Sequence, residues 1–305
     1  MKLYDAVVIG GGPAGMTAAL YLLRAGVKTA MIEKLSPGGQ ILMTSEIENY
    51  PGFPKGLQGW ELADKFAAHL EEYPLERIND EVRSIESNAD GHLIKVGDED
   101  VLAKVVILAS GCRYRKLNIP GEERLLGRGV SYCALCDGNF FRGREVAVVG
   151  GGNSALEEAL YLSRICSKVH LIHRRSEFRG QLVYQKKCLK NENIEIIRNT
   201  VVDEIVGETD VESVTLCNVD SGEMSTMNID AVFIFVGFEP IIDFVPDAVE
   251  KDRNGIITDV EMCTNIPGLF AAGDIRSKQC RQVASAVGDG ATAANSAFTY
   301  LEQQG

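Results

Sequence analysis

The sequence is short of basic residues: Lys and Arg number 31 against 43 Asp and Glu, which gives a formal net charge of −12 at pH 7. Proteins that bind nucleic acid usually carry a basic patch or stripe, so a nucleic-acid partner is not expected. The chain also lacks an apolar run of about 18 residues, the length that a membrane-spanning helix requires. Its opening residues lack the pattern of a secretory signal peptide. We therefore expect a cytoplasmic protein that binds neither nucleic acid nor membrane.

Cysteine is less scarce, with eight residues in 305, but only Cys133 and Cys136 lie close together. In a long chain without an export signal, most cysteines are expected to be reduced and buried. A structural zinc site would need two more ligands beside this pair. The other cysteines are isolated, and His170 and His173 are three apart on a predicted strand, where their side chains point to opposite faces. The C-x-x-C pair is therefore predicted to be redox-active.

A glycine-rich loop at Gly10–Gly15 fits the G-x-G-x-x-G pattern of dinucleotide-binding sites. It follows a predicted strand, Asp5–Ile9, and precedes a predicted helix, Pro13–Ala25. Glycines allow the backbone to turn tightly and to approach a pyrophosphate, which then lies at the positive end of the helix. The next predicted strand, Lys28–Ile32, leads to Glu33, whose carboxylate can accept a hydrogen bond from a ribose hydroxyl. Together these elements predict a dinucleotide site.

The same arrangement recurs at Gly150–Ala155, which fits G-x-G-x-x-A, between a predicted strand at Glu145–Val149 and a predicted helix at Ser154–Ile165. Where the following strand, Lys168–Ile172, ends, the chain has basic residues instead of an acid. They are His173, Arg174, Arg175 and Arg179. Guanidinium groups bind a phosphate through planar, bidentate hydrogen bonds, so the arginines favour NADPH over NADH. A solvated basic strand end without a ligand is the alternative.

Each of these two units closes with a further apolar strand that ends in glycine, at Lys104–Gly111 and at Asp230–Gly237. The sequence has no third fingerprint after this point. Instead, a short strand leads to Asp274, and a helix rich in small residues is predicted over Gln282–Leu301. This last segment is too small to form a domain, so we expect it to return to the first unit.

The predicted fold class is therefore α/β, with two Rossmann-like three-layer dinucleotide-binding domains, the second inserted into the first. The first, discontinuous domain comprises residues 1–115 and 246–305. The inserted domain comprises residues 116–245 and carries the C-x-x-C pair. Two dinucleotide sites and a dithiol on one chain indicate that a hydride enters, electrons cross the protein and a disulfide is reduced.

The sequence resembles, over essentially its whole length, the low-molecular-weight thioredoxin reductases, which are FAD-dependent pyridine nucleotide-disulfide oxidoreductases. Besides the two fingerprints, the resemblance rests on several short motifs. These are Gly38-Gly39-Gln40, Glu48-Asn49-Tyr50-Pro51-Gly52, the C-A-L-C-D-G run, H-R-R-x-x-x-R, and G-L-F-A-A-G-D followed by Arg281-Gln282-Val283. The resemblance implies a homodimer that reduces thioredoxin with NADPH, and a rotation of one domain against the other between half-reactions.

The resemblance also implies a role for particular residues. Cys136 would be the thiol nearest the flavin, Cys133 the thiol that attacks the substrate disulfide, and Asp137 the acid–base group for the leaving thiolate. The implied FAD contacts are Gly10, Gly12, Pro13, Ala14, Gly15, Glu33, Gly39, Gln40, Asn49, Val82, Gly111, Gly273, Asp274, Arg281, Gln282 and Val283. The implied NADPH contacts are Gly152, Asn153, Ser154, His173, Arg174, Arg175 and Arg179.

One departure from the family pattern concerns the partner. Asn139 replaces an aromatic residue that helps to dock thioredoxin in the family, although Phe140 and Phe141 keep part of that surface. A related small redoxin is therefore an alternative substrate. A second alternative takes electrons from ferredoxin, which predicts a degraded second fingerprint without the arginines. A third, of another class, is a flavin-containing redox sensor that turns nothing over.

Overall fold

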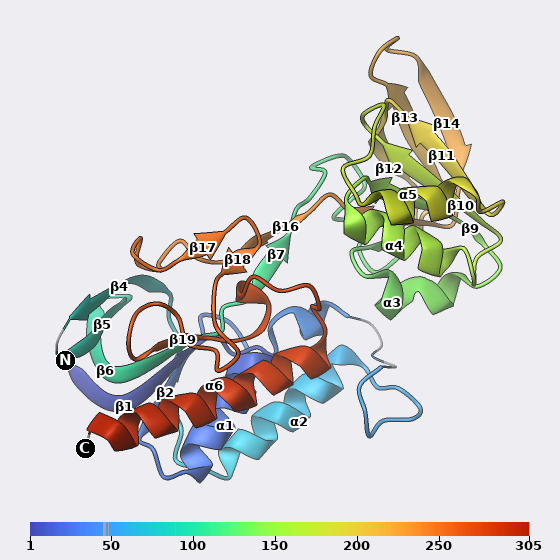
Figure 1. Cartoon of the computed structure of the whole chain (residues 1–305). Helices are drawn as coiled ribbons and strands as arrows, with labels where there is room; N and C mark the ends of the chain where they lie inside the picture. Colours follow the sequence, from blue (N-terminus) through green and yellow to red (C-terminus); the bar gives the residue numbers. More distant parts are fainter. Residues whose placement is uncertain (45–46, 48, 89, 305) are drawn as a thin grey trace. The chain divides into compact units, whose positions relative to one another are not determined.

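The computed structural model describes residues 1–44, 47, 49–88 and 90–304 (Figure 1). These residues form two compact units. The first unit consists of Met1–Arg113 and the segment that begins at Glu239, and the second is Tyr114–Phe238. In the part of the chain that the structure describes, no helix has the length and apolar character needed to cross a membrane.

The first unit is built on a seven-stranded sheet. Six strands follow the order β3-β2-β1-β6-β5-β4, and the seventh, β19, pairs with β6. The strands are β1 (Lys2–Ile9), β2 (Thr29–Ile32), β3 (Glu76–Ile78), β4 (Val82–Asn88), β5 (Gly91–Val96), β6 (Glu99–Leu108) and β19 (Leu269–Ala271). β5 pairs antiparallel with both β4 and β6, and the other pairings in this sheet are parallel. The predicted return of the C-terminal segment is realised in β19, because it joins the same sheet as β1.

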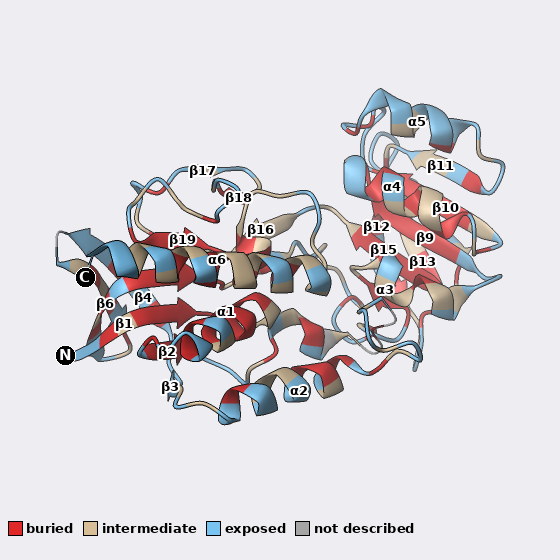
Figure 2. Cartoon of the chain, turned by 60° about the horizontal axis from the view of Figure 1, so that its bottom comes forward, coloured by how far each residue is buried: buried red, intermediate tan, exposed pale blue. Residues whose placement is uncertain are grey.

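Three helices cover one face of this sheet: α1 (Pro13–Arg24), α2 (Gly59–Glu71) and α6 (Val283–Gln304) (Figures 1 and 2). α1 and α6 pack against each other through small buried side chains such as Ala18 and Ala293. A second core, with Val7 and Leu108, lies on the opposite face under β4, β5 and part of the C-terminal segment. The short elements of this unit are η1 (Gly39–Met43), η3 (Gly273–Ile275), β17 (Lys251–Asp252) and β18 (Gly255–Ile256).

The second unit has a parallel five-stranded sheet with the order β11-β10-β9-β15-β8. Its strands are β8 (Val130–Ser131), β9 (Glu145–Gly150), β10 (Lys168–His173), β11 (Ile194–Arg198) and β15 (Ala231–Phe235). One face packs on α3 (Ala134–Asp137), α4 (Asn153–Leu162) and α5 (Leu182–Leu189), with η2 (Gly138–Phe141) after α3. The other face packs on an antiparallel sheet of β12 (Thr200–Val206), β13 (Ser213–Asn218) and β14 (Met224–Asn228). Both units are therefore layered α/β structures, and the predicted fold class is confirmed.

The two chain segments that join the units contain β7 (Cys112–Tyr114) and β16 (Phe238–Pro240), which pair with each other. The second border lies before Glu239, earlier in the chain than the predicted border after Val245. The reason is that Ile241 belongs to the first unit: its N–H donates to the Gly111 carbonyl at 3.0 Å, and its own carbonyl accepts the Ser110 hydroxyl at 2.8 Å. Val245, 5% exposed, is part of the first unit's core.

Candidate active site

Two glycines shape the first fingerprint loop. Gly10 has a φ of +110°, and a Cβ there would lie 2.3 Å from the Ala109 carbonyl oxygen. A Cβ on Gly15 would lie 1.9 Å from the Gly10 carbonyl oxygen, so neither position accepts a larger residue. Around the Cβ position of Gly12, by contrast, no atom of the described structure lies within 4 Å, and α1 begins beside it at Pro13. An open loop at a helix N-terminus is the geometry that binds a pyrophosphate.

Glu33 follows β2 and ties the fingerprint loop to the sheet. Its Oε2 accepts the Gly11 N–H at 2.7 Å, and its Oε1 accepts the Leu35 N–H at 2.9 Å. A carboxylate oxygen can accept a second hydrogen bond, so Glu33 can hold the loop and still accept a ribose hydroxyl. The position therefore fits the adenosine half of a dinucleotide.

Asp274 lies in η3, shortly after β19, and its side chain is half-buried, with Oδ1 shielded from solvent. Its Oδ1 lies 3.7 Å from the Lys278 ammonium but has no hydrogen-bond partner among the described residues. Burial raises the pKa of this carboxyl, and the nearby positive charges of Lys278 and Arg281 lower it in part. A buried carboxylate oxygen without a donor is costly unless a ligand supplies one. The ribityl hydroxyls of FAD are donors of the required kind.

Asp289 holds the turn that carries Asp274, and sequence reasoning missed it. Its Oδ2 accepts the Gly273 N–H at 3.1 Å, Lys278 Nζ at 2.8 Å and Arg276 Nη1 at 3.0 Å. The side chains of these three charged residues are only 12–13% exposed. One signal could have indicated this arrangement: Asp289 is an acidic residue in a helical stretch otherwise made of small and apolar residues, VASAVGDGATAA.

The other predicted FAD contacts also lie in the first unit. Gln40 Nε2 donates to the Cys112 carbonyl and lies 3.6 Å from its Sγ. Asn49 Nδ2 donates to Gln282 Oε1 at 3.1 Å, which brings two distant predicted contacts together. The Arg281 guanidinium donates to three backbone carbonyls and so fixes the loop before α6.

Three further predicted contacts differ in their surroundings. Gly39 and Gly111 have φ values of +58° and +73°, which favour glycine, and a Cβ on Gly39 would lie 3.1 Å from Gly12 Cα. Val82 begins β4, and its side chain, 9% exposed, belongs to the core, so only its backbone is left to contact a ligand. Glu48, which is part of a family motif, lies outside the described residues.

The second fingerprint has the same geometry in the second unit. Gly150 has a φ of +153°, and a Cβ there would lie 2.4 Å from the Phe235 carbonyl oxygen. Gly152 again has no described atom within 4 Å of its Cβ position, and α4 begins beside it at Asn153. The second unit therefore also presents an open glycine loop at a helix N-terminus.

His173 supports this loop from beneath. Its ring is 6% exposed, stacks on Phe178 with centroids 5.1 Å apart, and would lie 2.2 Å from a Cβ on Gly151. Burial lowers the pKa of His173, the hydrogen bond to the Glu177 carbonyl raises it in part, and the three nearby arginines lower it further. The side chains of Arg174, Arg175 and Arg179 are exposed, and the Arg179 N–H donates to the Gly151 carbonyl at 2.8 Å. These guanidinium groups are open to a phosphate beside the loop.

The redox pair opens α3 in the same unit. Cys133 and Cys136 form a disulfide with Cα atoms 5.3 Å apart. Cys133 is the N-cap of the helix, and its Sγ accepts the Cys136 N–H at 3.2 Å. Both cysteines are half-buried, and Leu135 between them is 41% exposed. The disulfide is therefore reachable at the surface of its unit.

Asp137 follows the pair and has two unlike carboxylate oxygens. Oδ2 accepts the Ser131 hydroxyl at 2.6 Å, whereas Oδ1 is buried without a hydrogen-bond partner among the described residues. Burial raises the pKa of Asp137, and the bond from Ser131 lowers it in part. Such a carboxyl holds a proton more readily than an exposed aspartate, which suits acid–base work. Sequence reasoning missed Ser131, although it stands two residues before the first cysteine.

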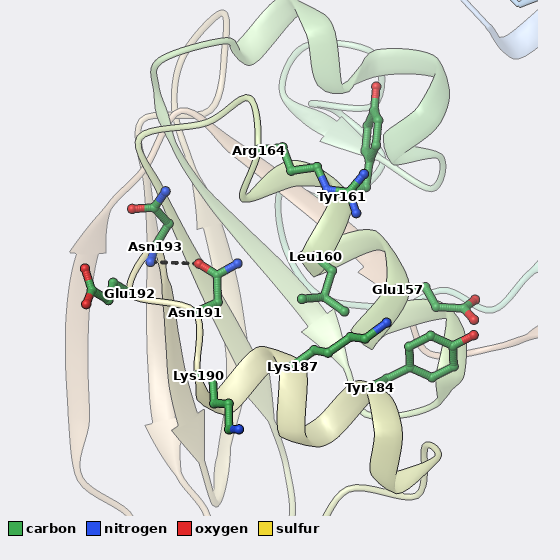
Figure 3. A pocket seen from close by; sticks show the side chains of 10 residues that line it. All are labelled: Glu157, Leu160, Tyr161, Arg164, Tyr184, Lys187, Lys190, Asn191, Glu192 and Asn193. Atoms are coloured by element: carbon green, nitrogen blue, oxygen red, sulfur yellow. Dashed lines mark hydrogen bonds between the residues drawn. The ribbon is translucent and has the colours of Figure 1, made fainter.

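A pocket of about 790 Å³ lies in the second unit between α4, α5 and the turn before β11 (Figure 3). Its charged lining contains both signs, with Arg164 and Lys187 among the cations and Glu157 and Glu192 among the acids. The predicted site residues do not line it, and its mixed charge favours no single class of ligand.

Comparison with known proteins agrees with this geometry. A family model described as pyridine nucleotide-disulphide oxidoreductase matches residues 4–290. A thioredoxin reductase of Listeria innocua is 44% identical over 304 residues, which covers 99% of this chain and 95% of the relative. The chain belongs to the thioredoxin reductases of the pyridine nucleotide-disulphide oxidoreductase family. Enzymes of this family use FAD and NADPH, for which the two fingerprint loops offer one site each.

Solved structures of thioredoxin reductases agree with this assignment. That of Streptococcus pyogenes is 45% identical, covers 99% of each chain and has a TM-score of 0.92. That of Lactococcus lactis, described as the FR conformation, is 46% identical, covers 98% of this chain and 99% of its own, and has a TM-score of 0.69. The predicted family resemblance is thereby confirmed.

Proposed function

We propose that this chain reduces thioredoxin with NADPH, through FAD bound to the first unit and the Cys133–Cys136 disulfide of the second. The observation that carries the proposal is the disulfide itself. Two half-buried cysteines are bonded to each other at the start of a helix, next to Asp137, whose carboxylate oxygen Oδ1 is buried. They lie on the unit whose fingerprint loop is flanked by exposed arginines. The thioredoxin reductases that the chain resembles support thioredoxin as the partner.

The residues of the first unit fit FAD. Glu33 offers an acceptor for the ribose, Gly12 an open backbone for the pyrophosphate, and Asp274 Oδ1 an unpaired acceptor for ribityl hydroxyls. FAD, when bound, supplies a carrier that accepts a hydride from NADPH and passes two electrons to the disulfide. The N-terminal end of α6, which begins at Val283, favours the negative charge that reduction adds to a flavin.

The second unit fits NADPH. Gly152 leaves the N-terminal end of α4 open to a pyrophosphate, and Arg174, Arg175 and Arg179 are exposed near the end of β10. A 2′-phosphate accepts bidentate hydrogen bonds from guanidinium groups, whereas the hydroxyl of NADH does not. The intact loop and the arginines also argue against a ferredoxin-type electron donor, for which neither feature is needed.

At the dithiol, the chemistry is thiol–disulfide exchange. Two electrons reduce the Cys133–Cys136 disulfide to a pair of thiols. Cys133, as a thiolate, then attacks one sulfur of the substrate disulfide, so a mixed disulfide forms and the substrate S–S bond breaks. Asp137 gives a proton to the leaving thiolate. Cys136 then loses its proton to Asp137 and attacks Cys133, which releases the second substrate thiolate and restores the Cys133–Cys136 disulfide. Two electrons pass to the substrate, and the second released thiolate takes its proton from water.

A rotation of one unit against the other is part of the proposal, because the FAD residues and the dithiol lie on different units. The chain crosses between the units twice, through segments that contain β7 and β16. Two solved relatives that are 45% and 46% identical have TM-scores of 0.92 and 0.69, a difference that sequence divergence does not explain. Rigid units joined by two segments can differ in this way between relatives.

The identity of the redoxin is less constrained than the chemistry. Asn139 accepts a hydrogen bond from Arg142 at 3.1 Å, where the family has an aromatic residue, and Phe140 beside it is 49% exposed. This altered surface favours a related small redoxin as the second candidate substrate. We further propose a homodimer in the cytoplasm on the basis of the family, which analytical ultracentrifugation and cell fractionation would test.

The test is NADPH oxidation by the FAD-loaded protein with thioredoxin as acceptor. Wild type should turn over steadily, which also excludes a sensor without catalysis. Cys133→Ser should abolish turnover, whereas Cys217→Ser, a matched change at a cysteine of β13, should leave it unchanged. Undiminished turnover by Cys133→Ser would mean that electrons leave by another route and would overturn the proposal.

A further inference from the structure

Ser131 joins the acid to the redox pair through one hydroxyl group. It is the last residue of β8, is 4% exposed, and stands two residues before Cys133. Its Oγ donates to Asp137 Oδ2 at 2.6 Å and accepts the Cys133 N–H at 3.0 Å. The Cys133 carbonyl, at 3.3 Å, is a second acceptor within reach. Because a hydroxyl has a single proton, the closer carboxylate is the stronger competitor for it.

The consequence is that the two oxygens of Asp137 are unequal. Oδ2 is engaged by Ser131, and Oδ1 is buried with no hydrogen-bond partner among the described residues. A proton on Oδ2 would have to compete with the hydroxyl donor, whereas a proton on Oδ1 does not. The hydroxyl thus decides which oxygen is protonated and fixes the side-chain rotamer relative to the Cys133 backbone.

We propose that Ser131 is a positioning residue for the reaction: its hydroxyl holds Asp137 Oδ2 as an acceptor, so that Oδ1 is the oxygen that gives and takes the proton. This inference rests on the proposed thiol–disulfide exchange and adds a residue to it. In the exchange, Oδ1–H protonates the leaving thiolate of the substrate, and the resulting carboxylate then takes the proton of Cys136. Ser131 keeps its own proton throughout and acts through Asp137.

The titratable groups around Asp137 are few. α3 packs against η2 and α4. η2 has no titratable side chain, and α3 itself contributes Cys136. α4 contributes Glu157, Glu158 and Tyr161. Burial is the main cause that raises the pKa of Asp137, and the hydrogen bond from Ser131 lowers it in part. Glu158 needs a control, because burial raises its pKa to about 7.

The test compares Ser131→Ala with Ser131→Thr, which keeps a hydroxyl, in the pH dependence of thioredoxin reduction by the FAD-loaded enzyme. Loss of a hydrogen bond to a charged group is expected to move the Asp137 limb of the profile about 1–2 pH units upward. The limb moves upward whether Asp137 acts as an acid or as a base, because the hydrogen bond from Ser131 lowers the pKa of Asp137 and its loss raises that pKa. Ser131→Ala should also lower kcat about tenfold, which is less than the rate factor of about 100 to 10,000 that general acid–base catalysis contributes as a whole. Ser131→Thr should restore both quantities, and Glu158→Gln should keep the wild-type limb.

Two measurements keep the inference distinct from the function on which it rests. The rate at which NADPH bleaches the flavin should be equal in wild type and Ser131→Ala, which shows that the variant is folded and loaded. In an Asp137→Asn background, Ser131→Ala should have no further effect on kcat, because the two residues act as one unit. A wild-type profile in Ser131→Ala, or additive losses in the double variant, would overturn the role of Ser131 alone. Absence of thioredoxin turnover in wild type would overturn the function itself.

Discussion

Replacing Asp289 with alanine should weaken both the first unit and its hold on FAD. Asp289 Oδ2 accepts the Gly273 N–H at 3.1 Å, Lys278 Nζ at 2.8 Å and Arg276 Nη1 at 3.0 Å. The charged partners are 12–13% exposed, so water does not screen them as it screens surface ion pairs. Asp289 therefore fixes the turn in which Asp274 is placed to meet the cofactor.

The size of the effect follows from this burial. Removing one partner of a buried ion pair costs about 3–5 kcal/mol, because a buried charge is left uncompensated. Two cations lose a partner here, but Lys278 keeps Asp274 at 3.7 Å, so we expect a cost near the middle of that range, about 4 kcal/mol. For a domain of 150–250 residues, such a loss lowers Tm by about 8–16 °C.

Thermal unfolding of the FAD-loaded protein, followed by circular dichroism and by the fluorescence of released FAD, measures this loss. The matched control is Glu302→Ala, an exposed acidic residue near the other end of α6, which should change the free energy of unfolding by less than about 0.5 kcal/mol. Both probes should report the lower Tm in Asp289→Ala. If Asp289→Ala unfolds and releases FAD at the temperature of Glu302→Ala, the clamp around Asp289 contributes nothing and the reasoning fails.

Three further predictions concern the two nucleotide loops and the acid. Arg174→Ala and Arg175→Ala should each lower kcat/KM for NADPH by a factor that corresponds to about 1.5–3 kcal/mol and leave kcat/KM for NADH nearly unchanged. Equal kcat/KM for the two nucleotides in wild type would contradict this. Gly10→Ala should abolish FAD binding, because its Cβ would lie 2.3 Å from a carbonyl oxygen. Gly26→Ala, also at positive φ but with open space around its Cβ, should keep FAD and lower the free energy of unfolding by only about 1–3 kcal/mol. Similar FAD retention in the two variants would count against the loop geometry. Because burial raises the pKa of Asp137, its contribution to stability is present at low pH and is lost as pH rises through that pKa. Asp137→Asn should therefore have a higher Tm than wild type at neutral pH and the same Tm as wild type at acidic pH. If the variant and wild type have equal Tm values at neutral pH as well, burial of Asp137 does not destabilise the protein.

The parts of the fold that depend on short-range pattern were predictable from the sequence. The helix predicted over Pro13–Ala25 is α1, Pro13–Arg24, and the strand predicted over Lys168–Ile172 is β10, Lys168–His173. Glu33 also lies where its distance from the first loop suggested, because a βαβ unit has a nearly fixed length. The antiparallel sheet β12-β13-β14 escaped prediction, since its strands have no fingerprint and their pairing depends on contacts across the domain.

Residues that act through other residues were the ones that sequence reasoning missed. Asp289 reaches Gly273 across 16 positions, and Ser131 reaches Asp137 across six, so no local motif indicates either bond. The surroundings of His173 were equally out of reach of a local motif: its position suggests a nucleotide contact, which stays a prediction, and the structure adds that its ring packs against Gly151. The position of a residue along a strand indicates whether it lies at the end of the sheet. Whether its side chain is buried depends on the other segments that pack against that end.

If electrons from NADPH pass through the Cys133–Cys136 disulfide to a protein disulfide, thiols must appear at these two cysteines in the wild-type protein, and they can be counted. The FAD-loaded protein is mixed with one equivalent of NADPH, quenched with a thiol-alkylating reagent and analysed by peptide mass spectrometry. Cys133 and Cys136, bonded to each other beforehand, should both become labelled. In a second sample, oxidised thioredoxin is added before the quench. Cys133 and Cys136 should then be bonded to each other again and stay unlabelled, and the cysteines of thioredoxin should be labelled instead. If NADPH is consumed and thioredoxin reduced while these two cysteines stay unlabelled in both samples, the electrons take a path that does not include this disulfide.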